Sequence, residues 1–201
     1  MPSRNSLLSA CLAMLTAGCA TVPADLPPLE LAPHVDLHRF MGDWYVIASI
    51  PTIFEDGVHN AKDTYELMPD GTIATTFTFN ADAPDGPVKH YKSVGFVLAP
   101  DSNAVWGQQY LWPFKADYRI SYVSPDYDVT VITRAKRDYV WIMARSPSMS
   151  NAELARLTAF VAAQGYDTTK LRRVPQLVND VSNRLGRAAA LTSGEAEPKS
   201  S

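Results

Sequence analysis

The feature that most constrains the fold is an alternation of β-branched or aromatic residues with polar ones, which runs from residue 44 to residue 146. It is clearest in "TYELMPDGTIATTFTFN", residues 64–80, where Pro69, Asp70 and Gly71 separate two strands. Five further stretches repeat the pattern: "HYKSVGFVL", "NAVWGQQY", "DYRISYV", "DVTVIT" and "DYVWIMARS". The pattern predicts about eight strands joined by short turns, with no crossover helices between them, and therefore an antiparallel sheet.

Alternation alone leaves a sandwich and an up-and-down barrel open. The segment "SNAELARLTAFVAAQGYD" has the capping pair Ser150 and Glu153, a stop at Gly165 and one apolar stripe, made of Leu154, Leu157 and Val161. A single amphipathic helix after the last main strand must bury this stripe against the outside of the sheet. We therefore expect an all-β barrel with one C-terminal helix packed on its outer face.

The last main strand has two covered faces, as this arrangement requires. Its outward face carries Val140, Ile142 and Ala144, whereas Tyr139, Trp141, Met143 and Arg145 occupy the other. We expect the helix to cover the first face and the barrel interior to enclose the second.

Composition and missing motifs exclude several functions. The 201 residues are 46% hydrophobic and carry a net charge of -3, which fits one domain and gives no broad basic surface for nucleic acid. The sequence contains no GxSxG, HExxH or Gly-rich phosphate motif. The four histidines, His34, His38, His59 and His90, lack the spacing of metal ligands, and Glu55 with Asp56 sits in a polar loop. We predict no metal site, no cofactor and no catalytic residue.

The N-terminal stretch "MPSRNSLLSACLAMLTAGCA" has the form of a secretory signal that is too short to span a bilayer. Its end, "LTAGC", resembles a lipobox, the cleavage motif of bacterial lipoproteins, which implies a lipid on Cys19. The only other cysteine is Cys11, so the mature chain has no disulfide. The alternative is an ordinary secretory peptide that is cleaved nearby. Ala20, in place of an aspartate, implies outer-membrane sorting by the same resemblance.

Three motifs in order resemble the signatures of the lipocalins, closest to the bacterial outer-membrane lipocalins and apolipoprotein D. They are "FMGDWYVIA" with Gly42 and Trp44, "SPDYDVTVI" with Asp126 and Tyr127, and "RDYVWIMARSP" with Arg145. The resemblance implies an eight-stranded barrel that holds small apolar molecules, with Trp44 at the closed end and Arg145 across its ring. It gives four segments: signal peptide 1–18, lipidated tether 19–33, lipocalin domain 34–178 and a disordered tail 179–201.

Parity along the strands predicts the residues that line a ligand cavity. If Trp44 and Arg145 lie at the closed end, the inward residues are Val46, Ala48, Phe77, Phe79, Tyr139, Trp141 and Met143. The small Ala48 favours an open cavity, and the alternative is a barrel filled by aromatic side chains.

The hairpin 108–122 gathers many aromatic residues, among them Tyr110, Trp112, Phe114 and Tyr118. This surface can fold back on itself, line the open mouth, or contact a membrane or a protein. We favour the mouth, together with Ile53 and Phe54 from another loop. Lys115 and Arg119 are candidates to attract an anionic head group.

The sequence therefore predicts a lipid-binding protein that is tethered by Cys19 to the periplasmic face of the bacterial outer membrane. The resemblance supplies the ligand class, a lysophospholipid or fatty acid, and binding needs no covalent step. Two alternatives stay open: an interaction module that docks through the hairpin 108–122, and an enzyme on a small apolar substrate with Tyr139 as its one inward candidate. Monomer and dimer both stay open.

Overall fold

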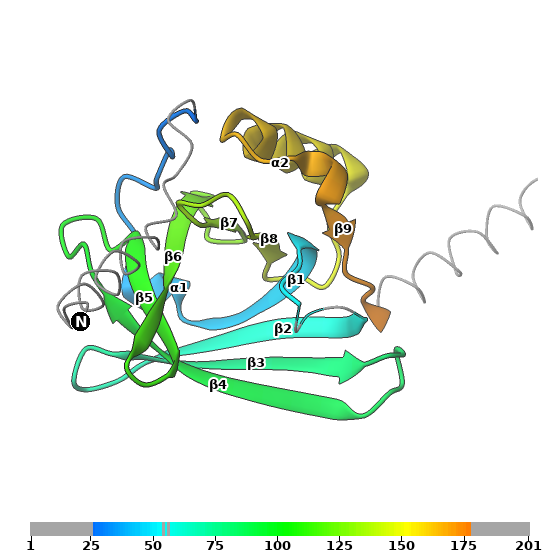
Figure 1. The fold of residues 1–201 in the computed structure, drawn as a ribbon, viewed down its shortest axis with the longest axis horizontal. Coiled ribbons are helices and arrows are strands. Elements are labelled where there is room, and N and C mark those ends of the chain that lie inside the picture. The colour runs from blue at the N-terminus through cyan, green and yellow to red at the C-terminus, as the bar shows by residue number, and fades with distance from the viewer. Residues whose placement is uncertain (1–25, 54, 56, 178–201) are drawn as a thin grey trace, which may run out of the picture.

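A computed structural model describes residues 26–53, 55 and 57–177 (Figure 1). Nine strands form one antiparallel sheet: β1 (Gly42–Ile50), β2 (Val58–Leu67), β3 (Ile73–Ala81), β4 (Val88–Val97), β5 (Val105–Leu111), β6 (Phe114–Val123), β7 (Val129–Thr133), β8 (Val140–Ala144) and β9 (Arg172–Arg173). Consecutive strands pair from β2 to β8, β8 pairs with β1, and β1 returns to β2. The first eight strands therefore close into the predicted up-and-down barrel, and β9 is a short addition at the edge of β1.

The predicted C-terminal helix is α2 (Asn151–Ala163), which lies outside the barrel beside β7 and β8 (Figure 1). The Ser150 hydroxyl accepts a hydrogen bond from the Glu153 backbone N–H at 3.1 Å, so the expected cap is present. A cluster of buried residues joins the helix stripe to the outward faces of β1, β7 and β8, and it includes Leu154, Leu157, Val161, Val131, Val140 and Ile142. This packing confirms the outward and inward faces predicted for 138–146.

Two short helical segments complete the described chain. The helix α1 (Leu37–Phe40) precedes β1 and places Phe40 in the core, and the 3-10 turn η1 (Thr168–Lys170) leads into β9. The sequence pattern did not predict α1, because four residues are too few to show a helical period.

A bulge in β1 changes the face of its second half. Val46 pairs with Met143, but the next paired residue, Ala48, lies opposite Ile142, so the residue between them is unpaired. Val46 therefore faces the barrel interior, while Ala48 belongs to the cluster beneath α2. The prediction that Ala48 lines the cavity is wrong, because strict alternation does not hold through a bulge. Ser49, which pairs with Trp141, takes the inward position instead.

Residues 26–33 lie against the barrel. The Ala32 backbone N–H donates to the Ile120 carbonyl at 3.0 Å, and the Glu30 N–H donates to the Gln164 side chain at 2.7 Å. This part of the predicted tether is therefore packed against the domain. The predicted signal peptide, Cys19 and the tail 179–201 lie outside the described residues. No helix in the part of the chain that the structure describes is both long enough and apolar enough to cross a bilayer.

Candidate ligand-binding site in the barrel lumen

The closed end of the barrel is built around Arg145. Its guanidinium lies 3.9 Å from the centre of the Trp44 ring and donates to the carbonyl oxygens of Arg39, Phe40, Met41 and Asp43 at 2.7 to 3.1 Å. The Trp44 indole N–H in turn donates to the Phe40 carbonyl at 2.8 Å. The contact that the resemblance implied between Trp44 and Arg145 is therefore confirmed, and it fastens α1 to β1.

Gly42 begins β1 with a φ of +93°, a backbone conformation that other residues adopt only with strain. A Cβ at this position would also lie 3.4 Å from the Arg145 guanidinium. The positive φ is therefore what favours glycine here, because 3.4 Å from the end of the Arg145 side chain is an ordinary van der Waals contact.

The second signature forms the turn between β6 and β7. Asp126 is exposed there, and Tyr127 has a φ of +61°. The Tyr127 hydroxyl accepts from the Asp36 backbone N–H at 2.8 Å, and the Arg39 guanidinium lies 4.1 Å above the Tyr127 ring. Tyr127 thus holds the start of α1 against the barrel.

Aromatic side chains fill the lower lumen, directly above the closed end. Their ring centres lie 5.1 to 6.3 Å apart, and the set comprises Phe40, Trp44, Tyr65, Trp106 and Tyr118. Tyr118, which we predicted at the mouth, is buried here with its hydroxyl 2.8 Å from that of Tyr65. Its position in the middle of β6, rather than at the hairpin tip, is the reason. The floor is therefore occupied by protein.

The upper lumen contains most of the other predicted ligand-binding residues. Val46, Phe79 and Met143 are buried in the interior cluster, and Phe77 and Trp141 are half-buried against it. The rings of Phe77 and Phe79 are 5.1 Å apart, and Tyr139 lies 6.4 Å from Trp141. Solvent reaches several of these inward side chains, so a ligand has surface to cover. Contact with a ligand stays a prediction for each of them.

The hairpin between β5 and β6 separates into an inner and an outer part. Trp112 and Phe114 at its tip are 81% and 73% exposed. Tyr110 is 63% exposed overall, but burial of its hydroxyl, together with the charges of Asp63 and Glu55, raises its pKa. Of the other mouth residues, Ile53 is exposed and Phe54 lies outside the described residues.

Lys115 and Arg119 do not face the lumen. The Lys115 ammonium lies 3.5 Å over the Phe96 ring, and Arg119 forms an ion pair with Asp117 at 2.8 Å. Both alternate along β6 with Tyr118, whose ring points inward, so both project outward. The prediction that they attract a head group at the mouth is wrong for this reason.

The lumen carries acidic groups that the sequence reasoning did not select. Asp63 lies in β2 opposite Trp44 of β1 and Phe77 of β3, so it shares their inward face. Burial, reinforced by the charge of Glu55, raises the pKa of Asp63 to about 8. Glu55 accepts from the Trp141 indole N–H at 3.1 Å and from the Thr52 backbone N–H at 3.0 Å, and burial raises its pKa also.

Further polar side chains face the lumen one or more inward positions away from Asp63. The Gln108 amide donates to the Ser93 hydroxyl at 2.7 Å, but the Gln108 carbonyl oxygen and the Thr75 hydroxyl have no hydrogen-bond partner. Thr75 pairs directly with Tyr65 on β2 and with Ser93 on β4. In the sequence, these Asp, Thr, Ser and Gln residues occupy strand positions on the inward face. This pattern is the signal from which polar groups in the lumen could have been predicted.

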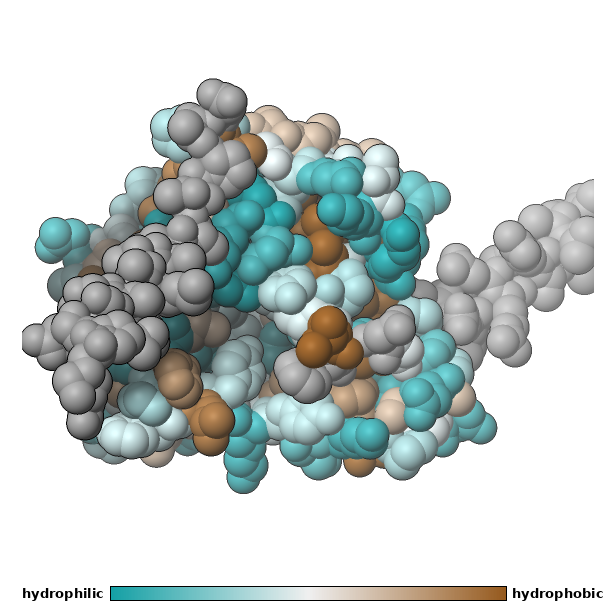
Figure 2. All heavy atoms as spheres, in the orientation of Figure 1, coloured by the Kyte–Doolittle hydropathy of each residue, from teal (hydrophilic) through white to brown (hydrophobic). Residues whose placement is uncertain are grey.

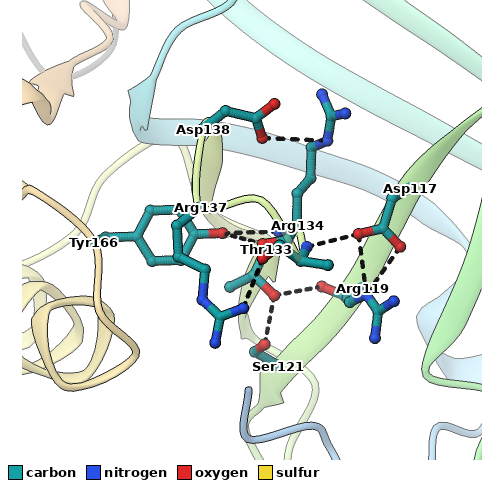
Figure 3. Close-up of polar contacts among 9 residues, drawn as sticks. Asp117, Arg119, Ser121, Thr133, Arg134, Arg137, Asp138 and Tyr166 are labelled. Atoms are coloured by element: carbon teal, nitrogen blue, oxygen red, sulfur yellow. Dashed lines mark hydrogen bonds and ion pairs between the residues drawn. The ribbon is translucent and has the colours of Figure 1, made fainter. Parts of the chain in front are cut away.

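One arginine stands near these acids. Arg134, in the loop after β7, forms an ion pair with Asp138 at 3.4 Å (Figure 3). Its guanidinium also lies 5.1 Å from the centre of the Tyr139 ring. Figure 3 also shows the neighbouring contacts that fix this loop, in which the Tyr166 hydroxyl accepts from the Arg134 backbone N–H at 2.8 Å. Asp138 therefore balances the charge of Arg134, although the buried Arg134 Nε has no hydrogen-bond partner.

Within residues 26–53, 55 and 57–177, no group of three or more His, Cys, Asp or Glu side chains is placed to hold a metal ion. On the face of the molecule shown in Figure 2, apolar side chains lie scattered among hydrophilic ones. A hollow outside the barrel is lined by residues of α2, η1 and β9, among them Leu154, Thr168 and Arg173. The groups selected above as candidate ligand contacts lie in the barrel interior and at its rim.

Comparisons with known proteins agree with this architecture. Residues 35–176 match the model of a lipocalin-like domain. The chain is 31% identical over 158 residues to temperature-induced lipocalin-1 of Arabidopsis thaliana, covering 74% of this chain and 83% of that protein. It is 25% identical over 169 residues to the outer membrane lipoprotein Blc of Escherichia coli K12, covering 84% and 94%. Insecticyanin of the tobacco hornworm Manduca sexta superposes with a TM-score of 0.58 at 13% identity, over 74% of this chain and 85% of that one. The chain belongs to the lipocalin-like family.

Proposed function

We propose that this protein binds a single-chain lipid, such as a lysophospholipid or a fatty acid, in the upper half of its barrel. The observation that carries the proposal is the division of the lumen. The floor is filled, whereas inward aromatic side chains above it, Phe77 and Trp141 among them, stay accessible to solvent. A concave, mostly apolar surface with a few polar groups is typical of small-molecule sites.

Binding by this mechanism is a partition between water and the lumen. Each Å² of apolar ligand surface removed from water contributes about 25 cal/mol. Such binding needs no covalent or metal-assisted step. We therefore propose a carrier or store rather than an enzyme.

The proposed location is the periplasmic face of a bacterial outer membrane, with Cys19 as the lipid anchor. Support comes from the lipobox-like "LTAGC" and from the similarity to a protein named outer membrane lipoprotein Blc. An anchored barrel stays close to the membrane lipids that it binds, and two or three acyl chains hold it firmly there. A role in maintaining the envelope follows from this placement.

The test uses the full chain with Cys19→Ser, which prevents lipidation. Native mass spectrometry should detect one bound lipid, and lysophospholipid should titrate the tryptophan fluorescence with one-to-one stoichiometry. Phe77→Ala should weaken binding several-fold, whereas Tyr122→Ala, which removes an aromatic ring that packs against Phe160 outside the barrel, should not. The absence of any saturable ligand would overturn the proposal.

A second candidate function rests on the hairpin tip. Leu111, Trp112 and Phe114 are 71% to 81% exposed, and an exposed apolar group of this kind often marks a contact surface. It would dock a protein of the cell envelope. Trp112→Glu should then abolish partner capture and leave lipid affinity unchanged.

A further inference from the structure

We infer, building on the binding function proposed above, that the lumen selects amphiphiles whose polar end carries a protonated amine and discriminates against carboxylates of the same chain length. The inference rests on which groups the barrel turns inward, which of them it leaves without partners, and where its cations lie.

The first step is the placement of Asp63. Its opposite neighbours in the sheet are Trp44 and Phe77, so its carboxyl group projects among aromatic side chains in the lumen. Within the described residues, no lysine, arginine or histidine forms an ion pair with it. A carboxylate in an apolar surrounding is costly unless a cation accompanies it. Here the protein supplies a hydrogen bond from Tyr65, which acts against the rise in pKa, but no cation, and a ligand can supply one.

The second step is a set of unsatisfied groups deeper in the lumen, beginning at Thr75, one inward position from Asp63. Thr75 and Gln108 are 94% or more buried, yet the Thr75 hydroxyl and the Gln108 carbonyl oxygen make no hydrogen bond. A buried amide oxygen can only accept, and a threonine oxygen accepts as readily as it donates. An ammonium group carries three donors and no acceptor, so it complements this set, whereas a carboxylate brings further acceptors.

The third step is the aromatic surrounding and the second carboxyl group. Glu55 sits at the rim on the Trp141 indole, and Tyr110, Phe77 and Trp141 face the same space. Aromatic faces attract cations, with a larger effect when the cation is desolvated. The upper lumen therefore combines two acids with aromatic rings.

The charged and titratable groups around Asp63 favour the same sign of ligand. These groups lie on the loops and strands packed around Asp63, and they are Glu55, Tyr65, Tyr110, Tyr118, Tyr139, Lys89 and the Arg134–Asp138 pair. Lys89 is exposed on the inward face of β4, and the pair of Arg134 with Asp138 is neutral. Lys89 opposes this preference from an exposed position, whereas the half-buried charged groups of the upper lumen, Asp63 and Glu55, are acidic.

The selection should depend on pH. Burial holds the pKa of Asp63 at about 8, so at pH 7 the empty protein keeps this carboxyl group mostly protonated. A bound cation favours the ionised form, so amine affinity should rise up to about tenfold per pH unit between pH 6 and pH 8 and then level off. Carboxylate affinity should fall over the same range.

The experiment compares three probes of equal length, dodecylamine, dodecanol and dodecanoate, by calorimetric titration of the full chain with Cys19→Ser at pH 6, 7, 8 and 9. We expect dodecylamine to bind at least about tenfold more tightly than dodecanoate at pH 8. Asp63→Asn should bring the two within about threefold. Glu66→Gln, on the same strand but exposed and outward, is the matched control and should change neither.

The outcomes separate the two proposals. Dodecanoate binding as tightly as dodecylamine, or selectivity that survives Asp63→Asn in a folded protein, would overturn the amine inference while leaving lipid binding intact. Saturable binding of none of the three probes would overturn the binding function and the inference with it. Circular dichroism of Asp63→Asn establishes that the variant is folded.

Discussion

The two halves of the barrel each hold an ionisable side chain among aromatic rings, and they treat it differently. At the closed end the Arg145 guanidinium is satisfied by carbonyl oxygens from Arg39 to Asp43 and by the face of Trp44. In the upper lumen Asp63 has no ion pair within the described residues, and deeper in the lumen the buried polar atoms of Thr75 and Gln108 have no hydrogen-bond partner. An ionisable group whose charge the protein satisfies serves the fold. An ionisable group that the protein leaves without a counter-charge is available to a ligand.

The largest effect should come from removing the satisfied charge. Arg145→Met keeps much of the side-chain volume but removes the guanidinium donor from the carbonyls of Arg39, Met41 and Asp43, while Phe40 keeps the Trp44 indole N–H, so the free energy of unfolding should fall by about 3 kcal/mol or more. Urea denaturation measures it. Arg156→Met, which breaks an exposed ion pair with Glu153 on α2, should cost less than about 1 kcal/mol. Equal losses in the two variants would contradict the special role of Arg145.

Asp63 should act differently from Arg145: it should make the free energy of unfolding fall as the pH rises. The pKa of Asp63 is raised from an ordinary value near 4 to about 8, so the folded state holds the proton more tightly than the unfolded state. Its contribution is fully present below about pH 4 and is lost as the pH rises to 8; about four units of pKa at about 1.4 kcal/mol each give at most about 5 kcal/mol. Asp63→Asn should flatten this slope. An unchanged slope in the variant would show that other groups cause it.

Gly42 tests the closed end of the barrel through its backbone conformation. Gly42→Ala forces a residue with a Cβ into a φ of +93° beside Arg145, which should cost about 1 to 2 kcal/mol of stability. Thermal unfolding measures the loss, and ligand affinity should stay the same because the floor separates Gly42 from the upper lumen. A loss of affinity at constant stability would show that the two halves are coupled.

The smallest effect on stability is expected for Glu55→Gln. The amide oxygen can still accept from the Trp141 indole, so the free energy of unfolding should change by less than about 1 kcal/mol. Preference for dodecylamine over dodecanoate should fall, but by less than in Asp63→Asn, since Glu55 lies at the rim. A larger loss than in Asp63→Asn, seen in the same titrations, would move the centre of the site to Glu55.

The sequence predicted what depends on local pattern. Turn residues and alternation identified the strands, the stripe through Leu154 and Val161 identified the helix, and the ordered motifs placed Trp44 against Arg145. The strands and the helix follow from spacing along single elements, whereas the contact of Trp44 with Arg145 was implied by the resemblance to the lipocalins.

The wrong predictions have physical causes that the spacing of residues along one strand does not reveal. One unpaired residue in β1 turned Ala48 from the lumen to the helix side, and a bulge depends on pairing with β8 rather than on β1 itself. Asp63 escaped notice because a polar residue in an alternating strand is ordinarily outward, and only its register against Trp44 and Phe77 reveals the inward face. Lys115 and Arg119 were assigned to the mouth by their nearness in sequence to aromatic residues, not by their face of β6.

The most direct test of the central claim counts the protons released when an amine binds. At pH 7 Asp63 is mostly protonated in the empty protein, so binding of dodecylamine should release close to one proton per ligand. Calorimetry in buffers of different ionisation enthalpy measures this number. The account predicts a release near one that disappears in Asp63→Asn and persists in Glu66→Gln. Saturable amine binding with no proton released by the unmutated lumen would contradict it.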